Sequence, residues 1–164
     1  MTWRGSTDAK DRIFGALAYL LPLYSSYEFG IFLFRQIPGL AEILAIALFP
    51  IAFLYNSLNS LGPFGSLIVF FVLFLAVVRN PRIAHFIRFN TMQAILIDIL
   101  VYLVGLLLSW VARVMGANLI VETLFNVIFL GALAACVYSI VQSVLGKYAE
   151  IPTVSDAAYS QVGG

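Results

Sequence analysis

Long apolar stretches dominate this chain and leave little sequence from which a water-soluble body could be built. Hydrophobic residues make up 62% of the 164 residues and charged residues only 10%, whereas a soluble domain carries about 25% charged residues. A soluble globule of this size could not hide so much apolar surface from water, but a lipid bilayer solvates it. The sequence therefore predicts an all-α, polytopic membrane protein whose first partner is the lipid bilayer.

Four stretches approach the roughly 20 mostly apolar residues that a membrane-crossing helix needs. They are residues 39–58, 63–78, 94–114 and 119–145. The second of them is short and needs flanking residues to cross. A fifth stretch, residues 13–34, is interrupted at Ser25, Ser26, Glu28 and Gly30. Crossing lipid there would bury a carboxylate and weaken the backbone hydrogen bonding, so we predict an N-terminal interfacial or re-entrant helical segment.

Basic residues sort to one side of this four-span arrangement. Eight of the nine Lys and Arg residues fall on the side of the two termini, and only Arg113 falls on the other. With residues 13–34 as an additional fifth span, the split would be five against four. Loops on the cytoplasmic side carry an excess of Lys and Arg. We therefore expect both termini in the cytoplasm or its organellar equivalent.

The same pattern divides the chain into three parts. Residues 1–38 form the N-terminal tail with the interfacial segment, and residues 39–145 form the four-helix transmembrane domain. Residues 146–164 form a C-terminal tail that is polar enough to leave the membrane.

Polar side chains recur near one face of the third predicted span. They are Asn90, Gln93, Asp98 and Tyr102. Ionisable groups within a span are costly, which makes each one a candidate functional site. One interpretation is that Asp98 marks the membrane boundary and bonds to neighbouring helices. The alternative is a wet surface between helices that lines a pathway or binds a partner.

Small residues recur at every fourth position of the last span. They are Gly131, Ala135, Ser139 and Ser143. Such a stripe lets helix backbones approach closely, because packing drives helix association in lipid. It predicts either packing within the chain or an interface in a homo- or hetero-oligomer.

A basic loop at residues 79–93 connects the second and third predicted spans. Its basic residues Arg79, Arg82 and Arg88 alternate with apolar ones. After Pro81 this spacing is typical of an amphipathic helix that lies on the membrane surface. It would anchor the chain to anionic headgroups or bind a partner or an incoming polypeptide.

Several classes of function find no support in the sequence. The chain has one cysteine, one histidine and a formal net charge of +1. It contains no Walker loop, zinc-protease motif or nucleophile elbow. We therefore expect no enzyme activity, no metal site, no cofactor and no nucleic-acid partner.

Four stretches of the chain resemble the twenty-kilodalton membrane subunit family of the chloroplast inner-envelope protein translocon (TIC). They are residues 19–23 (YLLPL), 78–81 (VRNP), 86–98 (FIRFNTMQAILID) and 150–158 (EIPTVSDAA). The resemblance implies four spans with both termini stromal or cytoplasmic, and a place beside other translocon subunits. A chloroplast precursor would carry a transit peptide that this chain lacks, so the resemblance points to a cyanobacterial or plastid-encoded member. The membrane would then be a cyanobacterial plasma or thylakoid membrane, or the plastid inner envelope.

Three functions are open at this point. The resemblance implies a membrane subunit of a protein translocation or import complex, which contributes to a protein-conducting pathway and contacts the translocating polypeptide. The alternatives are a small-solute transporter or channel for amino acids or ions, and a scaffold or assembly factor for membrane complexes.

Overall fold

The computed structural model describes residues 7–59 and 64–163, and every regular element in these two ranges is helical. The elements are α1 (Ala9–Ala18), α2 (Leu20–Ser26), the 3-10 turn η1 (Tyr27–Gly30), α3 (Ile31–Gln36), α4 (Pro38–Asn59), α5 (Gly65–Val72), the π-helical segment η2 (Leu73–Val78), α6 (His85–Met115), α7 (Leu119–Val144) and α8 (Val154–Val162).

Four helices in these ranges are long and apolar enough to cross a membrane. They are Ala9–Gln36, Pro38–Leu58, His85–Met115 and Leu119–Val144. The predicted all-α, multi-pass class with four such helices is therefore confirmed. Two of the predicted segments differ from the four that the structure has. The stretch predicted as interfacial, residues 13–34, lies inside the first long helix, and the predicted span 63–78 contains only a shorter apolar helix, Gly65–Val78.

The N-terminal segment stays helical because its interruptions are locally satisfied. Pro22 has no backbone N–H and crowds the preceding turn, which accounts for the boundary between α1 and α2 at Tyr19. Beyond it, the Ser26 hydroxyl donates to the carbonyl of Leu23 at 2.9 Å. The 3-10 turn η1 then leads into α3. The chain thus remains helical through the interruption, which keeps backbone hydrogen bonding within the segment.

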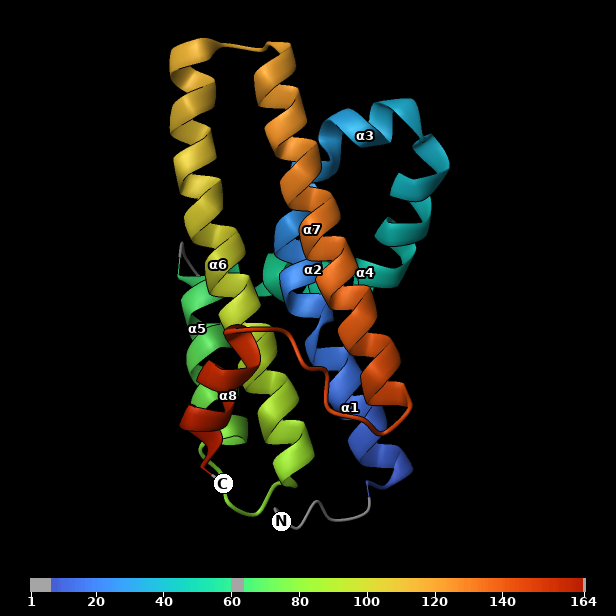
Figure 1. Cartoon of the computed structure of the whole chain (residues 1–164), viewed down its shortest axis with the longest axis vertical. Helices are drawn as coiled ribbons and strands as arrows, with labels where there is room; N and C mark the ends of the chain where they lie inside the picture. The colour runs from blue at the N-terminus through green and yellow to red at the C-terminus, as the bar shows by residue number, and fades with distance from the viewer. Residues whose placement is uncertain (1–6, 60–63, 164) are drawn as a thin grey trace.

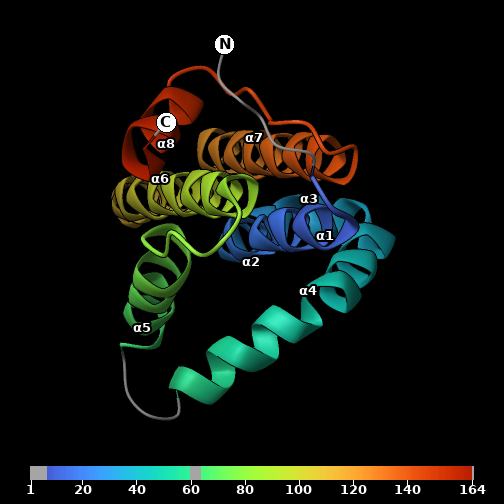
Figure 2. The same ribbon diagram turned by 90° about the horizontal axis from the view of Figure 1, so that it is seen from below.

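The next traverse of the molecule is made in two pieces. Helix α4 contains Pro50, which removes one backbone hydrogen bond and bends the helix. Its first half runs along the long axis of the molecule, and its second half turns across it at mid-height (Figures 1 and 2). Helix α5 and η2 then run to the end where the two termini lie (Figure 1).

This path places both termini at one end of the molecule. The loop between η2 and α6 also lies there, and the α3–α4 corner and the α6–α7 turn lie towards the other end (Figure 1). The segments at the terminal end carry Lys10, Arg12, Arg79, Arg82, Arg88 and Lys147. The opposite end carries Arg35 in the last turn of α3 and Arg113 in the last turn of α6. Basic residues thus concentrate at the end that holds the termini, although the first segment is a full-length helix.

The core forms where α1 and α2 pack between α6 and α7, as seen from below in Figure 2. Tyr19 and Phe129 are fully buried there, whereas Phe89 is fully buried in a second cluster that α6 forms with η2 and α8. Close approach of α1 to α6 depends on Gly15, because a Cβ atom at that position would lie 3.0 Å from the Phe86 ring. The C-terminal helix α8 folds back onto α6 at the end near the termini.

Candidate functional site

The first residue of the predicted polar stripe on α6, Asn90, is buried where three helices meet. The hydroxyls of Tyr19 and Ser143 both donate to its Oδ1 atom, each at 2.9 Å, and its Nδ2 donates to the Phe86 carbonyl at 2.8 Å. Asn90, Tyr19 and Ser143 are all fully buried. One side-chain oxygen therefore joins the N-terminal helix, α6 and α7, and its lone pairs are both used.

The second polar group, Gln93, holds the C-terminal segment. Its Oε1 accepts from the Ser155 hydroxyl at 3.1 Å, and that hydroxyl also approaches the Ala149 carbonyl at 3.0 Å. The Ile151 amide donates to the same hydroxyl at 2.6 Å. Gln93 is fully buried, and its Nε2 has no hydrogen-bond partner among the described residues. The side chain serves the docking of α8 rather than an open surface.

The upper half of the predicted stripe has different surroundings. Asp98 is half-buried, and its Oδ1 is shielded from solvent without a hydrogen-bond partner in the described ranges. Ser25 of α2 lies beside it. Tyr102, one turn further on, has 64% of its surface exposed. The structure thus places Asn90 and Gln93 in helix contacts and leaves Asp98 and Tyr102 near accessible space, and their role in lining a pathway stays a prediction.

A polar cavity of about 370 Å³ opens beside these two residues. It lies between α2 with η1, the second half of α4, the start of α5, and α6. Its polar lining consists of Tyr24, Ser25, Glu28, Tyr55, Ser66, Tyr102 and Ser109. The rings of Tyr24 and Tyr55 lie 5.0 Å apart and close one side of it. We call this space the polar cavity.

Sequence reasoning singled out only Tyr102 from this polar lining as a candidate site residue, and it named Ser25 and Glu28 only as interruptions of the stretch 13–34. The other polar residues come from five separate elements, α2, η1, α4, α5 and α6, each with an unremarkable local pattern. A signal was available in the two prolines, Pro22 and Pro50, because broken helices are where membrane proteins place polar groups.

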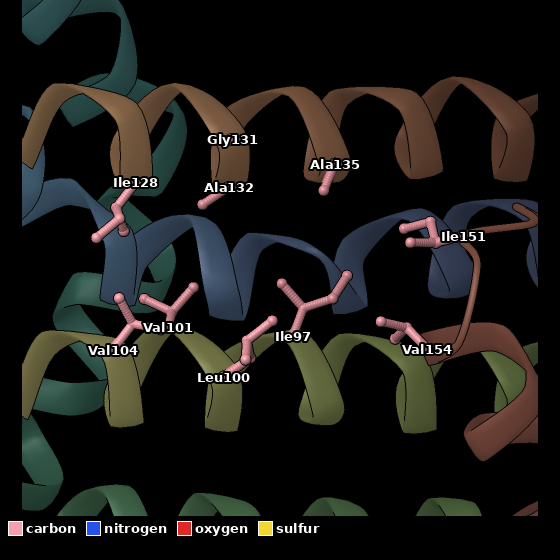
Figure 3. Close-up of a pocket in the computed structure, with 10 residues that line it drawn as sticks. All are labelled: Ile97, Leu100, Val101, Val104, Ile128, Gly131, Ala132, Ala135, Ile151 and Val154. Atoms are coloured by element: carbon pink, nitrogen blue, oxygen red, sulfur yellow. The ribbon is translucent and has the colours of Figure 1, made fainter. Parts of the chain in front are cut away.

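The small-residue stripe of α7 also divides into two halves. Ser139 and Ser143 are fully buried, whereas Gly131 is exposed and a Cβ atom there would meet none of the described atoms within 4 Å. Gly131 and Ala135 border an apolar groove of about 230 Å³ between α6 and α7. Figure 3 shows aliphatic side chains of both helices, with Ile151 and Val154 at one end of the groove. The stripe therefore packs inside the protein at one end and faces this groove at the other.

The basic loop differs from the prediction. Residues 85–93, expected in a surface helix, form the first turns of the long helix α6. Arg88 turns inward, where its Nε donates to the Val78 carbonyl at 2.8 Å and its Nη2 to the Val162 carbonyl at 2.7 Å. Arg79 and Arg82 remain exposed, and Arg79 lies over the Phe74 ring, 5.8 Å from its centre. Arg88 thus holds α8 against the first turns of α6. Of the three arginines, only Arg79 and Arg82 are free to contact lipid headgroups.

Within residues 7–59 and 64–163, no group of three or more His, Cys, Asp or Glu side chains could hold a metal ion.

These features define a multi-pass helical membrane protein with a polar cavity among its spans. They are the apolar composition of its long helices, the broken second traverse and the polar groups between helices. The chain belongs to the Tic20 family, and it matches the family described as "Chloroplast import apparatus Tic20-like" over residues 8–158. The resemblance found in the sequence is therefore confirmed.

Relatives in cyanobacteria, land plants and red algae share this family. A "Tic20 family protein" of Synechocystis sp. is 53% identical over 163 residues, which cover 99% of both chains. "Protein TIC 20-II, chloroplastic" of Arabidopsis thaliana is 36% identical over 159 residues, 95% of this chain and 74% of the relative. "Tic20 family protein Ycf60" of Porphyra purpurea is 31% identical, covering 99% of this chain and 81% of the relative. Translocon subunits of this family are non-enzymatic, which confirms the expectation that the protein is not an enzyme.

Proposed function

We propose that this protein is a membrane subunit of a protein translocation complex and contributes part of a protein-conducting pathway. The polar cavity carries the proposal: it brings hydroxyls and a carboxylate together within helices that are otherwise made for lipid. Polar groups at such depth are costly and are found where a substrate or water passes. The family description, an import apparatus, supports a polypeptide as that substrate.

One copy of the chain does not enclose such a pathway. The polar cavity is half-open and is bordered by only part of the bundle. Other membrane subunits, or further copies of this chain, would complete the wall. The apolar groove between α6 and α7, with the exposed Gly131, offers one surface on which a neighbouring helix could approach closely.

The distribution of basic residues supports both termini on the cytoplasmic or stromal side, following the rule that positive charge stays inside. The high identity to a cyanobacterial relative over the full length supports a cyanobacterial protein. Its membrane would then be the plasma or thylakoid membrane, while a plastid-encoded protein would lie in the inner envelope.

The proposal can be tested by photo-crosslinking in native membranes. A photoactivatable residue is placed at Tyr102 or Ser66, which border the polar cavity, and a matched one at Leu107, an exposed apolar residue of α6 outside it. We expect newly made or translocating polypeptide to be captured from the two cavity positions and mainly lipid from Leu107.

Other outcomes would favour the alternatives. Capture of fixed membrane subunits alone, from every position, would argue for a scaffold or assembly factor. Flux of an amino acid or ion through liposomes that hold the purified protein alone would argue for a small-solute transporter or channel.

A further inference from the structure

The polar cavity has an unbalanced charge. Among its described lining residues Glu28 is the one ionisable acid, and none is a lysine or arginine. A second carboxylate, Asp98, stands next to Ser25 with one oxygen that no described group satisfies. Carboxylates within membrane-spanning segments are costly without a partner. The cavity is therefore suited to bind a positively charged group.

Two neighbouring positive groups bear on this preference. Arg35 borders a separate hollow together with Glu28, but it does not line the polar cavity, and its guanidinium lies over the Phe32 ring, 5.6 Å from the ring centre. The N-terminus of α5 at Ser66 contributes about half a positive charge. This partial charge is smaller than the unit charge of an ionised carboxylate.

We propose that the polar cavity holds the lysine or arginine side chain of a polypeptide segment that is entering the membrane, with Glu28 as its counter-ion. This inference rests on the proposed function and names the chemical class that the site selects. The hydroxyl groups of Ser66, Tyr102 and Ser109 line the cavity. Their oxygens would accept hydrogen bonds from the cationic group in place of the bonds that it loses on leaving water.

The shape of the site fits such an occupant. A volume of about 370 Å³ lies near the lower end of the range of about 300–1,000 Å³ for ligand sites, so it suits one long side chain rather than a folded domain. The second half of α4 and the start of α5 lie away from the main bundle (Figure 2). Because the described residues do not enclose the polar cavity, a segment in the bilayer can reach it while its apolar residues remain in lipid.

The test uses the full-length protein in native membranes with a photoactivatable residue at Ser66. The probes are three versions of one newly synthesised apolar segment, which differ at a central position that holds Lys, Gln or Glu. We expect crosslinking of the Lys version to exceed that of the Gln version by roughly tenfold, equivalent to about 1.4 kcal/mol.

Two variants assign that preference to Glu28. Glu28→Gln should reduce the crosslinking of the Lys version to that of the Gln version, and Glu28→Lys should shift the preference to the Glu version. Glu28 is exposed, so neither change should prevent folding. The matched control is Glu42→Gln, which removes an exposed carboxylate from the first turns of α4 outside the cavity and should leave the preference for Lys unchanged.

The two ideas fail in different ways. Equal crosslinking of all three versions at Ser66, or a Lys preference that survives Glu28→Gln, would overturn the charge inference while polypeptide capture still supported the proposed function. Absence of polypeptide crosslinks at both Ser66 and Tyr102, with lipid captured instead, would overturn both.

Discussion

Replacing Asn90 by alanine should lower the free energy of unfolding more than any other single substitution on the polar face of α6. The change weakens the contact between the N-terminal helix, α6 and α7. The substitution removes the acceptor shared by the Tyr19 and Ser143 hydroxyls, both fully buried. Hydrogen bonds between membrane helices average about 0.6 kcal/mol and reach about 1.7. Two such losses, with the small void left by the amide, give an expected cost of about 2–3 kcal/mol.

The assay is reversible unfolding of the purified protein in mixed micelles, with SDS as denaturant and helix content followed by circular dichroism. Tyr19→Phe, Ser143→Ala and Asn90→Ala are measured singly and in pairs. In a double-mutant cycle, the Tyr19 and Asn90 substitutions should show a coupling of about 1 kcal/mol, because they remove the same hydrogen bond.

The matched control lies on α7. Asn126 is half-buried, and its Oδ1 is shielded without a hydrogen-bond partner among the described residues. Asn126→Ala should therefore leave stability unchanged or raise it slightly, because an unsatisfied polar atom is removed. Equal costs for Asn90→Ala and Asn126→Ala, with no coupling to Tyr19, would refute the view that this junction holds the helices together.

Three further substitutions test other contacts. Gly15→Leu should disrupt the packing of α1 on α6, since even a Cβ atom comes within 3.0 Å of the Phe86 ring; a fall in folded yield and in SDS resistance reports this. Gly146→Ala should cost about 1–2 kcal/mol by the same SDS titration, because φ there is +72°, a region that costs residues with a side chain about that much. Arg88→Met should release α8 by removing two hydrogen bonds, one of them to Val162, and limited proteolysis should then cut near the C-terminus at least several-fold faster.

Each of these changes has a matched control. Gly39→Leu, Gly39→Ala and Arg82→Met alter exposed positions of the same residue types. A Cβ atom at Gly39 meets none of the described atoms within 4 Å. Controls that lose as much stability or protection as their partners would show that the named contacts are not responsible.

The N-terminal segment shows why spans are harder to assign than to detect. Its polar interruption at residues 25–28 indicates an energetic penalty in lipid, and the penalty would be real for an isolated helix. In the structure, Ser26 satisfies a backbone carbonyl locally, and Glu28 lies on the polar cavity. Neither the local hydrogen bond nor the cavity can be read from hydropathy, because the cavity is made by distant elements.

The polar stripe of α6 shows a limit of periodicity. Residues of an α-helix advance by about 100° each, so Asn90 and Tyr102, twelve residues apart, differ by roughly 120° in direction. The pattern placed them near one face, but this drift turns Asn90 towards α7 and Tyr102 outward. Which neighbour covers each turn depends on contacts with residues such as Ser143 and Ser155, more than 50 positions away.

The basic loop was interpreted from local spacing alone, which cannot reveal a segment that returns to cover it. Arg88 bonds to Val162, 74 residues further along the chain. A surface helix would leave that arginine facing headgroups, whereas the returning α8 provides one carbonyl acceptor, Val162, beside that of Val78 in η2, and the arginine turns inward. The motif at residues 150–158 carried the family resemblance, and in the structure it contributes Ser155 to this docking.

The polar cavity follows from the short second traverse. The segment Gly65–Val78, made of 8 and 6 residues in α5 and η2, is about 21 Å long, while the hydrocarbon core of a bilayer is about 30 Å thick. The remaining thickness is crossed by the first half of α4, and the second half of α4 runs across the molecule beyond Pro50 to reach α5 (Figure 1). A straight helix would cover α6 over its whole height. The broken one leaves Tyr102 and Ser109 of α6 facing a space that a bound side chain can fill.

Because the polar cavity is a consequence of helix length, extending α5 by one apolar turn should narrow the cavity without removing any of its polar groups. Polypeptide crosslinking from a photoactivatable residue at Tyr102 should then fall.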